Sequence, residues 1–294
     1  MLKFLKNWTL PLAMFAGAIG YFLLANVTIL EPAKPFVNWL IAVLTPFLIF
    51  AQLLLTFCKI EPKELLPKAW HVWLLSIQAV SSGIIALLLI FCPMEEAYRD
   101  IFEGAMVCLI CPTATAAAVI TGKLGGSAST LTTYTLLSNV LAAIAVPLVF
   151  PLVEPHADIT FVVAFLKILS KVFPLLLAPF FIALLFRYYI PSVHRLLSKY
   201  HGVAFYLWAV ALTIVTGQTV RSLVTAAADV SIEIMIALAG LATCCLQFYF
   251  GKRIGSAYHD RISAGQALGQ KNTVLAIWMA VTYLNPLSSV GPGS

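Results

Sequence analysis

Apolar segments long enough to cross a lipid bilayer follow one another along almost the whole chain. Hydrophobic residues make up 61% of the 294 residues, charged residues only 10%, and the mean hydropathy is +0.97. Soluble domains contain about a quarter charged residues, and one membrane crossing needs about 20 consecutive apolar residues. The sequence therefore predicts an all-α polytopic membrane protein and excludes a soluble enzyme, a nucleic-acid-binding protein and a disulfide-stabilised secreted domain.

Nine of these segments are expected to cross the membrane. The sixth apolar run, 159–190, is too long for one crossing. We interpret its start, which contains Lys167 and Lys171, as an amphipathic interfacial stretch that leads into a crossing helix near 172–189. The other expected crossings are 8–30, 36–57, 70–91, 98–122, 127–153, 203–220, 230–250 and 264–283.

The distribution of basic residues predicts the orientation. If the N-terminus is cytoplasmic, twelve Lys and Arg residues fall on the cytoplasmic side, against five in outer loops or at the interface. Cytoplasmic loops of membrane proteins carry such an excess. We therefore expect a multi-pass protein of a bacterial inner membrane with its N-terminus inside. The net charge of +6 then reflects these loops, and no nucleic-acid partner is expected.

Two of the expected crossings are interrupted near their middle. Pro112 lies inside 98–122, where it removes a backbone hydrogen bond and breaks or kinks the helix. The segment 264–283 contains Gly265 and Gly269, followed by the polar run 270–273. Interrupted helices in corresponding positions of two halves are typical of inverted-repeat secondary transporters, whose binding site lies where the interruptions meet.

Two segments of sequence carry a family resemblance. Residues 111–119, CPTATAAAV, resemble the CPGGTASNV signature of the bile acid–sodium symporter family. Residues 267–276, ALGQKNTVLA, resemble that family's EVGMQNSGLA segment. The resemblance implies ten helices in two inverted repeats, here 1–158 and 159–294, with a panel domain and a core domain that holds two crossed discontinuous helices. Nine helices are expected in this sequence, and the resemblance calls for a tenth after Pro286. Either the natural chain is longer, which we favour, or the protein has nine helices and an outer C-terminus.

The sodium ligands implied by the resemblance are replaced in this chain. The family's Ser-Asn pair corresponds to Ala117 and Ala118, its Glu to Ala267, and its Gln to Lys271. A serine on the family's fifth helix corresponds to Leu131, while a threonine there is retained as Thr135. A lysine a few ångström from a sodium ion would repel it by several kcal/mol at intermediate dielectric. We therefore expect no metal or other cofactor, with proton coupling or uncoupled diffusion favoured over sodium coupling.

Lys271 has two interpretations. Its ammonium either substitutes for the sodium ions, by neutralising the carbonyl ends of the broken helices, or extends to the cytoplasmic interface and anchors the helix there. The polar neighbours Gln270, Asn272 and Thr273 favour the first interpretation.

The candidate site combines the residues around both interruptions. Thr113 and Thr115 are equally compatible with substrate contacts and with repair of the broken backbone, and interhelical hydrogen bonding is the ordinary role of polar residues on the fifth helix. The predicted crossing site comprises Pro112, Thr113, Thr115, Thr135, Gln270, Lys271, Asn272 and Thr273, with Gln78, Ser138 and Asn139 as possible supporting residues.

These features favour a secondary transporter of an organic anion, either bile-acid-like or a small carboxylate. The positive ends of the half-helices and Lys271 suit a carboxylate. The alternatives are a sodium-coupled anion symporter and a membrane receptor that binds without transporting. An enzyme is not expected, because the crossing region contains no pair of carboxylates or histidines.

Overall fold

The computed structural model describes residues 8–59, 61–155, 159–199, 203–225 and 230–284, and within these ranges its regular structure is helical. The expected tenth helix lies outside them. The elements are α2 (Thr9–Asn26), η1 (Thr28–Ala33), α3 (Lys34–Cys58), η2 (Pro62–Glu64), α4 (Ala69–Phe91), α5 (Glu96–Ile110), α6 (Ala117–Lys123), α7 (Ala128–Val153), α8 (Phe161–Tyr189), α9 (Pro191–Lys199), α10 (Val203–Thr225), α11 (Val230–Ala257), α12 (Arg261–Gly269), α13 (Thr273–Met279) and η3 (Ala280–Leu284).

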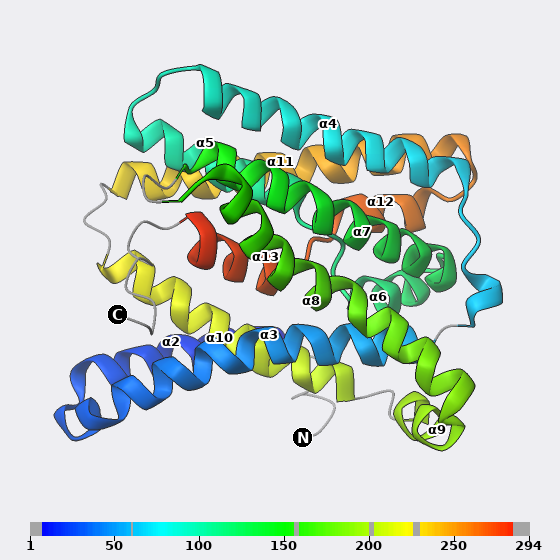
Figure 1. Cartoon of the computed structure of the whole chain (residues 1–294), viewed down its shortest axis with the longest axis horizontal. Helices are drawn as coiled ribbons and strands as arrows, with labels where there is room; N and C mark the ends of the chain where they lie inside the picture. Colours follow the sequence, from blue (N-terminus) through cyan, green and yellow to red (C-terminus); the bar gives the residue numbers. More distant parts are fainter. Residues whose placement is uncertain (1–7, 60, 156–158, 200–202, 226–229, 285–294) are drawn as a thin grey trace.

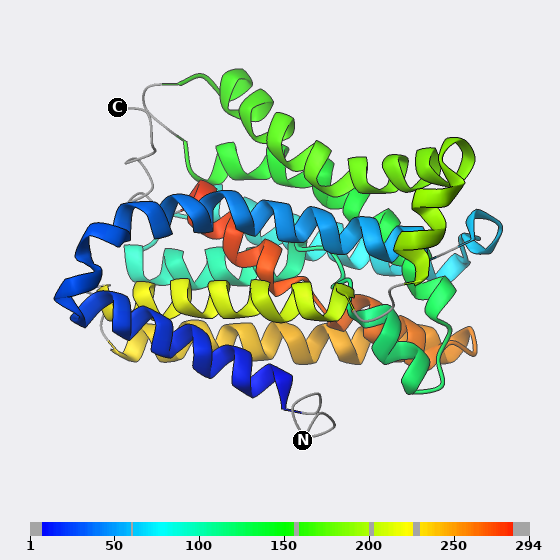
Figure 2. The same cartoon turned by 90° about the horizontal axis from the view of Figure 1, so that it is seen from below.

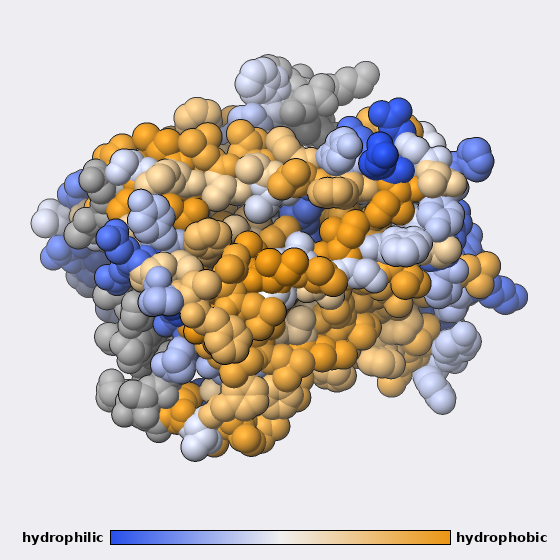
Figure 3. Space-filling model, turned by 90° about the horizontal axis from the view of Figure 1, so that it is seen from above, coloured by the Kyte–Doolittle hydropathy of each residue, from blue (hydrophilic) through white to orange (hydrophobic). Residues whose placement is uncertain are grey.

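The predicted all-α polytopic membrane protein is confirmed. In the described ranges, six helices are long and apolar enough to cross a membrane: the continuous η1–α3 segment, α4, α7, α8, α10 and α11. Figure 3 shows hydrophobic side chains covering the middle of one face, with hydrophilic side chains gathered towards the two ends. Such an apolar girdle is what a bilayer core requires of the surface that it surrounds.

The helices form two layers. The first contains α2, α3, α8 and α10, which pack side by side (Figures 1 and 2). The second contains α4, α5, α7, α11 and α12, with α7 packed against α8 of the first layer. Between them lies α13, which contacts α3 and α10 on one side and α5 on the other.

One sequence-based expectation about the sixth run is wrong. Residues 161–189 form the single continuous helix α8 and not an interfacial stretch followed by a shorter crossing. Ala164, Ile168 and Val172, four residues apart, are buried along one face, while Lys167 and Lys171 are exposed on another. The buried stripe continues past the lysines, so packing against α3 and α7 holds the helix together over its whole length.

A hydrogen-bonded carboxylate connects α4 to the start of α12. Asp260 accepts hydrogen bonds from the Lys68 ammonium, from the Trp70 indole N–H at 3.2 Å and from the Ser263 hydroxyl at 3.2 Å. Burial opposes ionisation of this carboxyl, but the three donors outweigh it and lower the pKa of Asp260 below its usual value. The contact fixes α12 against α4 at the end of the bundle shown on the right of Figure 1, which we call the basic end.

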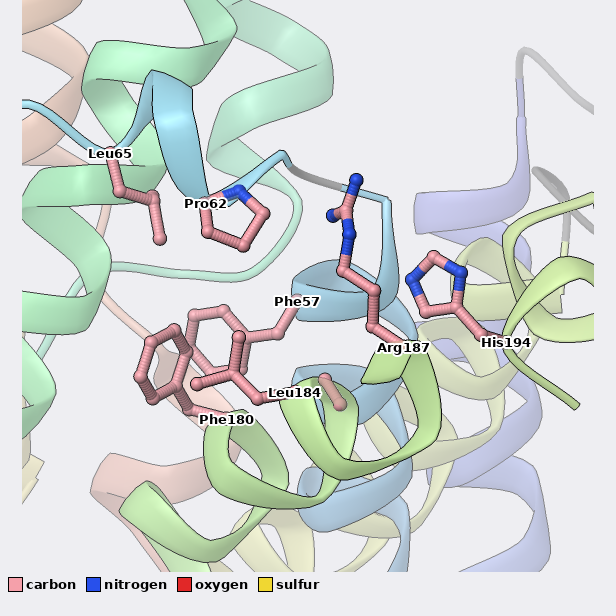
Figure 4. Close-up of a pocket in the computed structure, with 8 residues that line it drawn as sticks. Phe57, Pro62, Leu65, Phe180, Leu184, Arg187 and His194 are labelled. Atoms are coloured by element: carbon pink, nitrogen blue, oxygen red, sulfur yellow. The ribbon is translucent and has the colours of Figure 1, made fainter. Parts of the chain in front are cut away.

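A small apolar hollow lies at the same end, between α3, η2, α8 and α9. The rings of Phe57 and Phe180 pack edge to face, with centroids 5.5 Å apart, on one side of it, and Arg187 and His194 lie on the other (Figure 4). Its volume is about 10 Å³, roughly the space that one water molecule needs. It is therefore too small for an organic substrate.

The position of α12 depends on glycines in α11. A Cβ atom added at Gly251 would lie 2.6 Å from the Ala264 carbonyl oxygen, whereas one added at Gly240 would meet nothing within 4 Å. Small residues at helix–helix contacts in membranes allow such close approach.

We expect Gly251→Ala to lower the melting temperature of the purified protein, because the added methyl overpacks the α11–α12 contact at a cost of about 1–3 kcal/mol. Gly240→Ala in the same helix is the control and should leave the melting temperature unchanged or raise it, since alanine has the higher helix propensity. Equal effects of the two substitutions would contradict the proposed packing.

Candidate functional site at the helix interruptions

The two interrupted helices meet at their interruptions. Between α5 and α6, and between α12 and α13, the chain is extended for a few residues, and Thr113 pairs with Lys271 as an isolated antiparallel bridge. The Ala114 N–H donates to the Gln270 carbonyl at 2.9 Å, and the Asn272 N–H donates to the Pro112 carbonyl at 2.9 Å. Each interruption therefore supplies hydrogen-bond partners for backbone groups that the other has freed.

The carbonyl end of α5 is satisfied by two side chains. A helix leaves its last four carbonyls without intrahelical partners, and Pro112, which follows, has no N–H to donate. The Lys271 ammonium donates to the Leu109 carbonyl at 3.4 Å. Gln78 of α4 donates through Nε2 to the carbonyls of Ile110 at 2.9 Å and Cys111 at 3.3 Å.

Gln78 connects three helices, because both the nitrogen and the oxygen of its side-chain amide form hydrogen bonds. Its side chain is buried, and its Oε1 accepts hydrogen bonds from the Tyr134 hydroxyl at 3.1 Å and the Ser138 hydroxyl at 3.0 Å, both on α7. With the bonds from Nε2 to α5, the residue joins α4, α5 and α7 at the depth of the interruption. This arrangement assigns Gln78 and Ser138 a supporting role.

The second interruption is closed by reciprocal contacts. The Thr113 hydroxyl donates to the Ala267 carbonyl at 2.6 Å, and the Cys111 thiol donates to the Asn272 carbonyl at 3.1 Å. Asn272 also caps α13, because its Oδ1 accepts from the Leu275 N–H at 3.2 Å. Thr113 and Asn272 therefore serve to repair the broken backbone.

Lys271 is half-buried and points towards α5. Its bond to Leu109 places the ammonium at the carbonyl end of the α5 half-helix, where the helix dipole favours a cation. This direction leads away from the basic end, where α12 begins, and so does not fit an anchor at that interface. In the described part of the chain, no ion pair includes Lys271.

The residues present do not fit a sodium ion at the positions that the resemblance implies. Ala117, Leu131 and Ala267 are each 0% exposed and belong to one hydrophobic cluster with Trp70, Leu74, Tyr134, Ala264 and Leu268. Sodium is a hard cation that needs oxygen ligands, and the side chains of Ala117, Leu131 and Ala267 offer none. The Tyr134 hydroxyl of the same cluster donates to Gln78 Oε1. Thr135 does have a side-chain oxygen, but its hydroxyl donates to the Leu131 carbonyl of its own helix at 3.1 Å.

The remaining predicted residues divide between the crossing and its surroundings. The Thr115 side chain contacts the layer that contains α3, where its hydroxyl donates to Gln52 Oε1 at 3.3 Å. Gln270 takes part through its carbonyl, and its buried Oε1 has no hydrogen-bond partner. Thr273 is the first residue of α13 and is exposed. Asn139 is buried in α7, and its Nδ2 has no hydrogen-bond partner among the described residues.

Gln52 lies in no sequence motif, and for such a residue the sequence indicates only an ordinary interhelical hydrogen bond. It is 3% exposed on α3 and its Oε1 accepts from Thr115, while its buried Nε2 has no hydrogen-bond partner among the residues that the structure describes. A signal was present, because Gln52 follows Leu48 and Ile49 at helical spacing and so lies on the buried face of a membrane helix. A polar residue on such a face is a functional candidate.

No family model matches this sequence, and no curated protein matches it significantly. The function proposed below therefore rests on the geometry of the crossing and on the residues around it.

We expect Gln78→Leu to destabilise the protein by about 2 kcal/mol or more, because it leaves buried carbonyls and hydroxyls unpaired. Thermal unfolding in detergent measures the change. Gln247→Leu on α11 is the control, since the Gln247 side chain makes one long hydrogen bond, 3.4 Å, to the Cys108 carbonyl. The role of Gln78 in connecting the three helices is wrong if the two variants lose the same stability.

Proposed function

We propose that the protein is a secondary transporter of an organic anion, and that the anion binds beside Lys271 at the crossed interruptions. The observation that carries this proposal is the Lys271 ammonium, held at membrane depth by a backbone carbonyl and without a carboxylate partner in the described residues. Ionisable groups at this depth are costly and are retained where they have a function. A fixed cation favours an anionic substrate.

The two-layer arrangement supports an alternating-access mechanism. In this mechanism the layer of α4, α5, α7, α11 and α12 is the core domain, and the layer of α2, α3, α8 and α10 is the panel domain. The two interruptions occupy the fourth crossings of the proposed inverted repeats, 1–158 and 159–294. Movement of the core against the panel would expose the crossing to one side of the membrane and then to the other.

Transport in this proposal does not depend on sodium. The hydrophobic cluster around Ala117 and Ala267 occupies the positions of the implied ion ligands, and Lys271 already supplies a positive charge at the carbonyl end of α5. The Lys271 ammonium and a sodium ion each carry one positive charge and would repel each other here by several kcal/mol. Proton coupling and uncoupled diffusion of the anion are the remaining energetic schemes.

The proposed location is the bacterial inner membrane, with the N-terminus and the basic end on the cytoplasmic side. The connections and helix ends at the basic end carry Lys59, Lys63, Lys68, Lys123, Arg187, Lys252 and Arg253. Positive residues concentrate in cytoplasmic connections because they resist translocation.

Thermal-shift screening of the purified protein against organic carboxylates, with sodium and pH varied independently, tests the proposal. A bound anion raises the apparent stability by mass action, and we expect this shift without sodium. Counterflow of the labelled anion into proteoliposomes then separates a transporter from a receptor, which would bind without exchange. A shift that requires sodium would overturn the sodium-independent mechanism.

We expect Lys271→Gln to weaken anion binding and uptake about 10- to 100-fold, the usual contribution of one charge-assisted hydrogen bond. Glutamine retains a donor for the Leu109 carbonyl, so the melting temperature without ligand should change little. Lys123→Gln, at the exposed end of α6, is the control and should transport normally. Unchanged uptake by Lys271→Gln would refute the role of Lys271.

We expect Gln52→Leu to reduce anion affinity several-fold with only a small loss of stability, because the substitution breaks a single 3.3 Å hydrogen bond from the half-buried Thr115 hydroxyl. Removing Nε2 breaks no hydrogen bond within the described residues, but it removes a donor that a carboxylate oxygen of the substrate would accept from. Thr45→Val, which removes a buried hydroxyl bonded only within α3, is the matched control. If the Gln52→Leu variant is unfolded, or if it binds the anion with the affinity of the wild type, the proposed contact between Gln52 and the substrate is wrong.

A further inference from the structure

An open cleft lies at the basic end, between the end of α6, the last turns of α11 and the first turns of α12. Its volume is about 520 Å³, and it is lined by Leu124, Lys252, Arg261, Ile262 and Gln266. We call it the basic cleft. It is separate from the crossing, because α12 extends from Arg261 at the cleft to Gly269 at the interruption.

Lys252 is held in place by packing. A Cβ atom added at Gly265 would lie 2.7 Å from its Cγ, so the lysine stem lies directly over that glycine of α12. The ammonium lies 5.8 Å from the centroid of the Phe248 ring, a distance at which a cation is attracted to an aromatic face. The cation is therefore positioned at the cleft even though its residue is exposed.

The two cations of the basic cleft are not neutralised by the protein. Neither Lys252 nor Arg261 forms an ion pair with any residue in the described ranges. Asp260, the residue before Arg261, is occupied by its bonds to Lys68, Trp70 and Ser263. The cleft therefore presents two positive charges to whatever enters it.

The remaining lining residues define the kind of anion. Leu124 is 52% and Ile262 40% exposed, so the rim is apolar. In the described ranges the buried Oε1 of Gln266 has no hydrogen-bond partner, which leaves an acceptor that a ligand hydroxyl would satisfy. An anion with hydroxyl donors and an attached hydrocarbon chain matches all three features.

The cleft also lies next to a surface that lipid covers. Leu241, Leu246 and Tyr249, on the turns of α11 before Lys252, are each more than half exposed. Hydrocarbon chains of lipids must cover these side chains, since α11 is among the helices long and apolar enough to cross the membrane. A headgroup attached to such a chain would lie at the level of the cleft.

We propose that the basic cleft binds the headgroup of an anionic glycerophospholipid such as phosphatidylglycerol. Lys252 and Arg261 contact the phosphate, Gln266 accepts a hydrogen bond from a headgroup hydroxyl, and Leu124 and Ile262 contact the first methylene groups of the acyl chains. Basic pockets between membrane helices have this chemistry. A lipid bound there packs α12 against α6 and α11, and so stabilises the helix that leads to the crossing.

The test uses the full-length protein in nanodiscs of phosphatidylcholine with increasing fractions of phosphatidylglycerol. We expect the melting temperature of the wild-type protein to rise with phosphatidylglycerol, and less so at high salt. In the double variant Lys252→Gln/Arg261→Gln, the fraction of phosphatidylglycerol that gives half of the rise in melting temperature should increase about thirtyfold. This factor corresponds to the binding energy that two interfacial basic residues typically contribute. The control, Lys123→Gln/Arg253→Gln, removes the same charge from exposed residues outside the lining and should respond like the wild type.

Two further arms identify the source of the anion. Glycerol phosphate added to phosphatidylcholine nanodiscs should give no comparable rise, and a full rise would overturn the lipid in favour of a soluble anion. Gln266→Leu should abolish the preference for phosphatidylglycerol over phosphatidic acid while keeping the response to both. If the lining variant and the control variant lose the response to phosphatidylglycerol equally, general surface charge explains the effect and the proposed site is wrong.

Discussion

The requirement that every backbone polar group in a bilayer be paired within the protein determines the centre of this structure. Pro112 breaks one helix, and Gly269 ends another. The bonds between Ala114 and Gln270 and between Asn272 and Pro112 satisfy both interruptions together. Because neither interruption is satisfied alone, α5–α6 and α12–α13 are held in one relative position, and the polar side chains around them are placed at membrane depth.

The charge at this centre belongs to the chain itself. Lys271 lies at the carbonyl end of α5, and alanines and a leucine fill the positions where the resembled family has polar side chains. In the proposed mechanism this cation cannot leave with the substrate, in contrast to a bound ion. We accordingly propose that the energy for transport comes from the gradient of the anion or from protons, and we expect affinity for the anion in the absence of sodium.

Particular residues show how far the sequence alone could be interpreted. The two interruptions were visible because proline and glycine have local backbone consequences that do not depend on the rest of the fold. The continuity of α8 could not be predicted, because Lys167 and Lys171 suggest an interfacial segment. Only the structure shows that Ala164, Ile168 and Val172 form a buried stripe along the same stretch of helix. The partner of Gln52 could not be predicted either, since its contact with Thr115 joins residues 63 positions apart.

The sequence by itself determined the class of protein, the approximate crossings and the two places where helices break, because hydropathy and the chemistry of proline and glycine act over one turn or one bilayer thickness. Only the tertiary structure decided which donors satisfy the freed carbonyls, where the Lys271 ammonium points and that Gln78 joins three helices. Such pairings depend on side chains brought together from distant segments, and no local pattern specifies them.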